Sequence, residues 1–172
     1  LEYQPVLLAL LRVADGMGNS RPLMRSIAGI MMRAVEDNFE QEGRPKWQDL
    51  HPGTKLSRSK GGTWPGKILQ RSGGLAGSIQ QQFDERSAVV GTNKVYAAIH
   101  QFGGKTRAHV IRPKNKRALS FGGIVVRSVN HPGSDIPARP FLHLTPGDQR
   151  DIIGAAQQHY NKALARNGLQ SG

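Results

Sequence analysis

The most regular hydrophobic pattern lies between residues 69 and 104 and predicts one compact unit. Gln80 to Phe83 has the length of a short strand, and the more apolar Ala88 to Gly91 predicts a second one. The polar residues 84–87 between them are typical of a turn. We therefore expect two antiparallel strands, which must bury one face against another layer.

A helix is predicted directly after these strands. Thr92 or Asn93 can cap its start, and Gly103 with Gly104 ends it, because glycine enters left-handed conformations without a Cβ clash. The spacing of its apolar residues places them on one face. These residues are Val95, Tyr96, Ile99 and Phe102.

Helices are also predicted on both sides of this unit. A short one spans Pro5 to Ala14, and a longer one begins at Ser20 with Pro22 in its first turn and ends at residues 43–45. A third begins at Thr145 and ends at Gly168. Helical spacing gives the second helix a stripe of Leu23, Ile27, Ile30, Met31, Ala34, Val35 and Phe39. The third carries Ile152, Ile153, Ala156, Tyr160, Ala163 and Leu164.

Two stretches lack this regularity. Residues 46–67 have almost no periodicity and predict a long loop anchored by Trp47 and Trp64, which packs either on a neighbouring subunit or on its own domain. Residues 118–129 predict a β-hairpin around a Gly-Gly turn within a second long loop. The fold class that follows is α+β: a small antiparallel sheet packed by N-terminal, central and C-terminal helices. We expect one domain over residues 1–172, with arms at about 43–68 and 105–138.

Positive charge is concentrated in these two arms. The formal net charge is +12, residues 43–71 contain seven Lys or Arg and one acid, and residues 105–127 contain seven and no acid. Such arms favour contact with polyanions or with acidic protein surfaces, although basic loops can also serve solubility alone. The candidate contact residues are Trp47, Lys55, Arg58, Lys60, Trp64, Lys67, Lys105, Arg107, Arg112, Lys114, Lys116, Arg117 and Arg127.

The sequence offers no recognisable catalytic or cofactor site. It contains no cysteine, its six histidines are dispersed, and no nucleophile-elbow pattern is present. Residues 61–67 fit the spacing GxxxxGK, but Ile68 follows where Mg²⁺ ligation needs Ser or Thr, and Pro65 removes a backbone N–H. We therefore expect neither an enzyme nor a bound cofactor.

Membrane insertion is not expected either, because no run approaches ~20 apolar residues. The first predicted helix lacks the basic region and cleavage site of a signal peptide. Nonspecific nucleic-acid binding stays open, because the basic arms could neutralise phosphates. Recognition of the bases is not indicated, since few aromatic residues lie among the cations to stack on them.

Three ordered blocks resemble the phage virion morphogenesis family, the tail-completion and neck proteins of Mu-like phages. They are SGGLAGSI at residues 72–79, VVGTNKVYAAIHQFGG at 89–104 and PARPFL at 137–142. The resemblance implies a structural virion protein that forms a ring, most often a hexamer, at the head–tail junction. The implied partners are copies of itself, adjacent connector and tail proteins, and genomic DNA in the channel. It also implies residence in the virion, and in the host cytoplasm during assembly.

The resemblance assigns fold-setting roles by motif. The first block sets the turn before the sheet, the second supplies a strand and the core helix, and the third locks a final strand onto them. Gly74 departs from relatives that often carry a larger or basic residue, which implies a looser turn. The residues are Leu69, Ser72, Gly73, Leu75, Ser78, Ile79, Gly91, Tyr96, His100, Phe102, Gly103, Arg139, Pro140 and Phe141. Whether the basic arms line a DNA channel or grip adjacent rings stays open.

Overall fold

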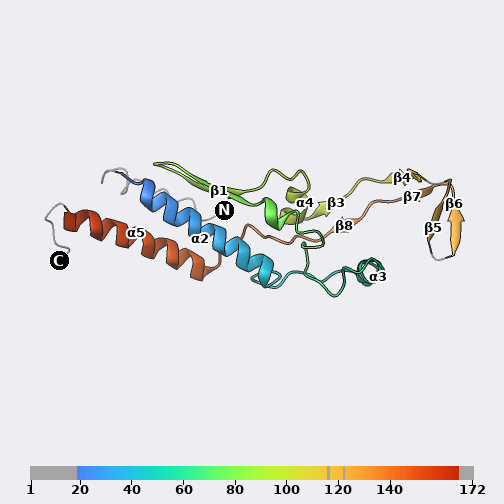
Figure 1. Ribbon diagram of the computed structural model, residues 1–172, viewed down its shortest axis with the longest axis horizontal. Helices are drawn as coiled ribbons and strands as arrows, with labels where there is room; N and C mark the ends of the chain where they lie inside the picture. Colours follow the sequence, from blue (N-terminus) through green and yellow to red (C-terminus); the bar gives the residue numbers. More distant parts are fainter. Residues whose placement is uncertain (1–18, 116, 122, 167–172) are drawn as a thin grey trace.

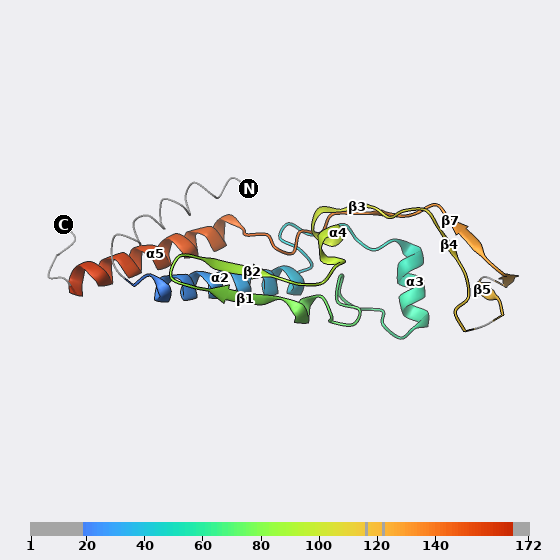
Figure 2. The same ribbon diagram turned by 90° about the horizontal axis from the view of Figure 1, so that it is seen from above.

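A computed structural model describes residues 19–115, 117–121 and 123–166 of the chain. The helix predicted for residues 5–14, the candidate Lys116 and the tail after residue 166 lie outside the described residues. The molecule is elongated, with a helical body at one end and a narrow β ribbon at the other (Figures 1 and 2). This is the α+β class expected from the sequence, with small antiparallel sheets and separate helices.

Helix α2 (Arg21–Glu40) is the centre of the body. It packs against α5 (Pro146–Arg166) on one side and against the β-hairpin of residues 80–91 on the other (Figure 1). The predicted start of α2 after Ser20 is confirmed, with proline in its first turn, whereas the helix ends at Glu40, before the predicted residues 43–45. Six of the seven residues of the predicted stripe are buried, and Met31 is half-buried. The buried residues of α2 are Leu23, Met24, Ile27, Ala28, Ile30, Ala34, Val35, Asn38 and Phe39.

Strands β1 (Gln80–Phe83) and β2 (Ala88–Gly91) have the predicted bounds and pair antiparallel. Asp84 fixes the turn between them, because its side chain accepts hydrogen bonds from the backbone N–H groups of Arg86 and Ser87, both at 2.7 Å. Leu75 of the first motif block precedes a single 3₁₀ turn, η1 (Ala76–Ser78), which leads into β1. This unit supplies the second layer against α2.

Aromatic residues fill the core at the end of α2. Phe141 is completely buried and lies 5.5 Å from the ring of Phe39, which meets Trp47 edge to face at 5.9 Å. Trp47 therefore packs on its own body. Trp64 is half-buried, with the ammonium of Lys55 5.3 Å from its ring.

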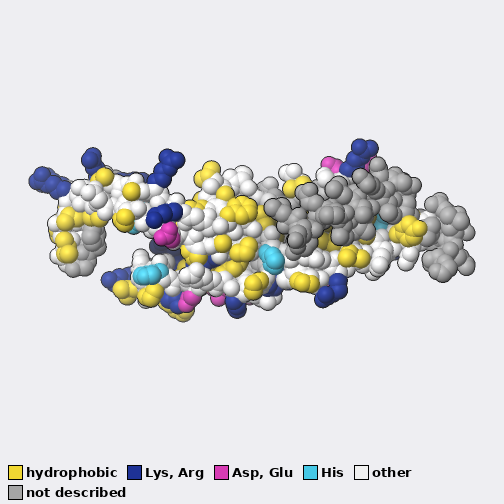
Figure 3. All heavy atoms as spheres, turned by 180° about the vertical axis from the view of Figure 1, so that it is seen from behind, with side chains coloured by type: hydrophobic (Ala, Val, Ile, Leu, Met, Phe, Trp, Pro, Cys, Tyr) yellow, Lys and Arg dark blue, Asp and Glu magenta, His cyan; other side chains and the backbone are white. Residues whose placement is uncertain are grey.

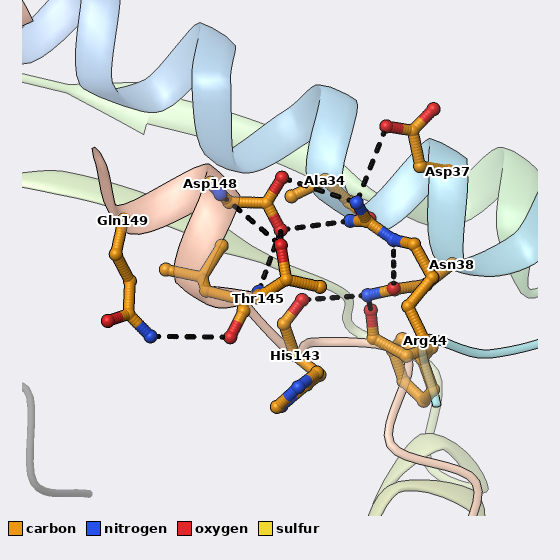
Figure 4. Close-up of polar contacts among 10 residues, drawn as sticks. Ala34, Asp37, Asn38, Arg44, His143, Thr145, Asp148 and Gln149 are labelled. Atoms are coloured by element: carbon orange, nitrogen blue, oxygen red, sulfur yellow. Dashed lines mark hydrogen bonds and ion pairs between the residues drawn. The ribbon is translucent and has the colours of Figure 1, made fainter. Parts of the chain in front are cut away.

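A buried asparagine joins α2 to the chain before α5. Asn38 is fully buried, and its amide nitrogen donates to the carbonyls of Phe141 (2.9 Å) and His143 (2.8 Å) (Figure 4). These bonds satisfy carbonyls that have no strand partner. The apolar stripe did not reveal this contact, because a polar residue in a helix is read as solvent-facing.

Arg44 completes this junction. Its guanidinium donates to both carboxylate oxygens of Asp148, at 3.0 and 3.3 Å, and to the carbonyl of Ala34 at 2.8 Å. Its Nε donates to the side-chain oxygen of Asn38 at 2.9 Å (Figure 4). Asp148 also forms the predicted cap of α5, since it accepts the Thr145 N–H while its own N–H reaches the Thr145 hydroxyl. The end of α2 and the start of α5 thus share one ion pair.

Three predictions about local structure are wrong. Helix α3 (Pro52–Lys60) lies inside the predicted loop, started by the side chain of His51, which accepts the Gly53 N–H at 3.1 Å, and by Pro52. Arg58 is its only buried residue, so the helix has no apolar stripe for a pattern to reveal. The segment at residues 139–142 is irregular and not a strand.

The third error concerns α4 (Ala97–Phe102), whose N-cap is Tyr96 and not Thr92 or Asn93. Its predicted apolar face is not the buried one: Val95 is 96% exposed and Phe102 is 78% exposed, while Ala97 is buried. Of the predicted α5 stripe, Ile152 and Ala156 are buried, whereas Ile153 and Tyr160 are exposed. The predicted end of α4 at Gly103 is confirmed, with φ of 71°.

Residues 104–136 form a two-stranded ribbon, called the β arm below. Strand β3 (Gly104–Lys105) pairs with β8 (Asp135–Ile136), β4 (His109–Ile111) with β7 (Val129–His131), and β5 (Leu119–Phe121) with β6 (Ile124–Val126). The β5–β6 pair is the predicted hairpin; the other two pairs were not predicted. Gly133, with φ of 93°, lets the strands approach, because a Cβ there would lie 2.1 Å from the Thr106 carbonyl oxygen.

Asp148→Asn should lower the free energy of unfolding by about 1–3 kcal/mol at neutral pH, because Arg44 then keeps only its longer ion pair with Asp37, at 3.7 Å. Burial raises the pKa of Asp148, but hydrogen bonds from Thr145 and Arg44 outweigh it and leave the pKa below its ordinary value. This stabilisation is full above about pH 3.9 and is lost as the pH falls through the lower folded-state pKa. Denaturant unfolding across acidic pH should therefore show a flatter profile for the variant.

The matched control for this prediction is Asp151→Asn, an exposed position on the same helix. Equal destabilisation by both substitutions would contradict the role of the junction.

Replacing residues 107–133 by an Asn-Gly turn should change the stability of the body by less than about 1 kcal/mol. The reason is that no side chain described in the β arm is buried. Calorimetry of the full and shortened chains measures this, and an unfolded shortened chain would show that the arm supports the core.

Candidate assembly surface

Several cations of the first basic arm, at about residues 43–68, form hydrogen bonds or ion pairs within the chain. Arg58 is buried and donates to the Lys67 carbonyl at 3.2 Å, and Lys67 itself forms an ion pair with Glu40. Lys55 pairs with Asp49, and this hydrogen bond lowers the pKa of Asp49. Among the candidate cations of this arm, Lys60 is exposed at the end of α3. The surface available to a polyanion is therefore smaller than the sequence count indicates.

The β arm presents its charge differently. Five of its cations are exposed, and within the described part of the chain their side chains make no hydrogen bond or ion pair; they are Arg107, Arg112, Lys114, Arg117 and Arg127. Lys105, at the base, lies 4.0 Å from Asp135. Lys and Arg side chains project along the arm at the left of Figure 3. This is the unpaired cationic surface expected from residues 105–127.

Aliphatic side chains are exposed between these cations. Val110 is 50% exposed, Ile124 60% and Val125 67%. Val110 and Val125 do not pack into any core of the described chain. Cationic and aliphatic groups are therefore mixed on one projecting surface, which is typical of a protein-binding site.

The base of the β arm is fixed to the body by Arg139. Its backbone N–H donates to the His100 carbonyl at 2.7 Å, and its guanidinium donates to the carbonyls of Gln48 (3.1 Å) and Asp49 (3.3 Å). Gly103 permits this approach, because a Cβ there would lie 2.8 Å from the Ala138 nitrogen. Burial, and secondly the charge of Arg139, lowers the pKa of His100, so the imidazole is neutral at physiological pH. The arm leaves the body in a defined direction.

The fold-setting residues named from the motif blocks lie mostly at this base and in the core. Leu75, Ile79 and Phe141 are buried, and Ser78 bonds to Thr92 at 2.7 Å. Other members are more exposed than a core role requires. Ser72 and Gly73 lie in an exposed turn, Leu69 has φ of 59°, Tyr96 meets His100 edge to face at 6.2 Å, and Pro140 and Gly91 are half-buried.

Sequence reasoning missed a stacked histidine pair on the arm. His109 and His131 lie opposite each other in β4 and β7 with ring centroids 5.1 Å apart. Within the described residues no group of three His, Cys, Asp or Glu could hold a metal ion. In the same part of the chain, no helix is long and apolar enough to cross a membrane.

Comparison with known proteins points to one group. A sequence model of the phage virion morphogenesis family matches residues 1–161. The chain is 38% identical over 157 residues to Mu-like prophage FluMu G protein 2 of Haemophilus influenzae, covering 91% of this chain and 90% of that protein. It is 28% identical over 148 residues to the putative capsid assembly protein G of Escherichia phage Mu, covering 84% of this chain and 81% of that one.

A third relative, Mu-like prophage FluMu G protein 1 of Haemophilus influenzae, is 36% identical over 99 residues, which cover 55% of this chain and 64% of that protein. No solved structure matches the chain. The match over nearly the whole sequence confirms the resemblance drawn from the three motif blocks, and the chain belongs to the phage virion morphogenesis family.

Proposed function

We propose that the chain is a structural, non-enzymatic virion protein of a tailed phage that forms a ring at the head–tail junction and supports joining of the tail to the DNA-filled head. The observation that carries this proposal is the β arm, which projects from the body, has no buried side chain among its described residues and exposes cations beside aliphatic groups. Such a surface is stabilised when other proteins cover it. Family membership and the name of the phage Mu relative support a role in particle assembly.

In this proposal the body and the arm have separate tasks. The α2 core and the Arg44–Asp148 junction keep the body rigid, and Arg139 sets the direction of the arm. The partners are copies of the chain in a ring, most simply a hexamer, together with adjacent connector and tail proteins. Assembly takes place in the host cytoplasm before the chain becomes part of the virion.

Deleting the gene from the phage or prophage that carries it should yield DNA-filled heads and separate tails, counted by electron microscopy, with infectivity restored by the intact gene. Supplying the chain with residues 107–133 replaced by an Asn-Gly turn should not restore joining, because the body is retained without the arm. The outcomes against the proposal are joined, infectious particles without the chain, or a failure to build heads at all. The second of these would place the chain in capsid assembly proper.

A second candidate function is nonspecific nucleic-acid binding, which the unpaired cations of the β arm favour. If it is correct, the affinity for duplex DNA should fall steeply with salt. Replacing Lys114, Arg117 and Arg127 by Gln should then reduce the salt slope by about one per cation. Fluorescence anisotropy measures this, and an unchanged slope would exclude the arm as a phosphate-binding surface.

A further inference from the structure

A groove in the body combines apolar and acidic side chains, whereas residues 105–127 of the β arm contain no acid. It lies between α2 and the η1 turn and has a volume of about 190 Å³. Its lining is mostly apolar and consists of Met32, Val35, Phe39, Ala76 and Ile79, together with the polar Gln70. Glu36 and Glu40 of α2 stand at its rim. Both acids are exposed, and the Glu40 side chain is 74% exposed although it pairs with Lys67. We call this the acid-rimmed groove.

The tip of the β arm has the complementary surface. Ile124 and Val125 in β6 are 60% and 67% exposed, and the neighbouring Arg117 and Arg127 are exposed cations. From Lys105 to Arg127 the sequence has no acid, so no carboxylate on this stretch opposes them. An apolar centre with a rim of one charge meets an apolar groove with a rim of the other, which is the arrangement that favours a specific interface.

The arm cannot place its tip in the groove of the same chain. It leaves the body beyond α4 and runs away along the long axis, while the groove lies on the part of α2 behind it (Figures 1 and 2). Arg139 and the close approach at Gly103 hold the base in this direction. The complementary surfaces must therefore belong to different molecules.

We infer that the tip of the β arm, with Ile124 and Val125 at its centre, docks into the acid-rimmed groove of a second copy of this chain. The two surfaces differ, so the contact is heterologous, and each copy keeps one free tip and one free groove. Repetition of such a contact closes into a ring when the rotation per copy allows it. The inference rests on the proposed function and specifies which surfaces join neighbouring subunits.

DNA is the less suitable occupant of the tip. Backbone phosphates satisfy cations but leave exposed aliphatic side chains in water, and Ile124 and Val125 offer no aromatic face for a base. The acid-rimmed groove satisfies both kinds of group at once.

Cysteine cross-linking tests this contact directly, because the natural sequence contains no cysteine. Full-length Val125→Cys and Met32→Cys chains, mixed in equal amounts at concentrations up to about millimolar, are treated with a short thiol-to-thiol linker. The expected result is a mixed dimer that forms at least about ten times faster than with the matched control, Val125→Cys plus Val89→Cys, since one favourable contact of 1.4 kcal/mol is tenfold. Val89 is 54% exposed on β2 and does not line the groove.

Charge reversal supplies a second test. Glu36→Lys with Glu40→Lys in the Met32→Cys chain should remove the cross-linking advantage. Combining that chain with a Val125→Cys chain that also carries Arg117→Glu and Arg127→Glu should restore part of the cross-linking rate. Cross-linking no faster than the Val89 control, or unaffected by reversal of the acids, would overturn the inference. Circular dichroism of each variant confirms that it is folded.

The same cross-link sought in assembled particles separates this inference from the proposed function. Particles that need the chain for head–tail joining but show no Val125–Met32 product would overturn the docking contact and leave the proposed function standing. Particles that join normally without the chain would remove the proposed function itself.

Discussion

Burial of the apolar residues of α2 holds the body together. The hairpin β1–β2 covers α2 on one side and α5 covers it on the other. Leu23, Ile27 and Phe39 of α2 are each less than 5% exposed. Asn38 and Arg44 then fix the end of α2 to the segment before α5, so that a small core becomes a defined body. Helix α5 and strands β1 and β2 pack directly on α2, and the remaining elements are connected to this body.

The same core sets a limit on what the chain can bury by itself. It contains 16 buried hydrophobic residues within the described chain, and all of them lie outside the β arm. The arm is built from backbone pairing with little side-chain packing, and a two-stranded ribbon of this kind is only marginally stable in water. Among its described residues, five cations make no hydrogen bond or ion pair, and Val110, Ile124 and Val125 are at least half exposed. In the proposed function, this division between a packed body and an exposed arm connects the fold to assembly.

The sequence predicted the elements that bury a periodic face. Helix α2, the bounds of β1 and β2, the cap of α5 and the β5–β6 hairpin all follow from spacing and turn chemistry. Elements without such a face were missed. Helix α3 exposes almost all of its side chains, and strands β3, β4, β7 and β8 are two or three residues long among prolines and glycines.

The sequence located the candidate surface only in part, because local patterns do not show which residues meet across the fold. Charge counts along the chain located the basic arms, but they could not show that Arg44 and Arg58 are used inside the body while Arg112 and Arg127 are not. That distinction depends on contacts between residues far apart in sequence, such as Arg44 with Asp148. The outward direction of Val95 and Phe102 likewise depends on where α4 attaches, which helical spacing does not contain.

In the proposed function, the exposed β arm becomes covered by other proteins when the particle is built. Amide hydrogen exchange of β4 to β7, measured in the free chain and in purified particles, tests this most directly. We expect the arm to exchange rapidly in the free chain and to be strongly protected in the particle, while the α2 core is protected in both. Equal exchange of the arm in the two states would contradict it.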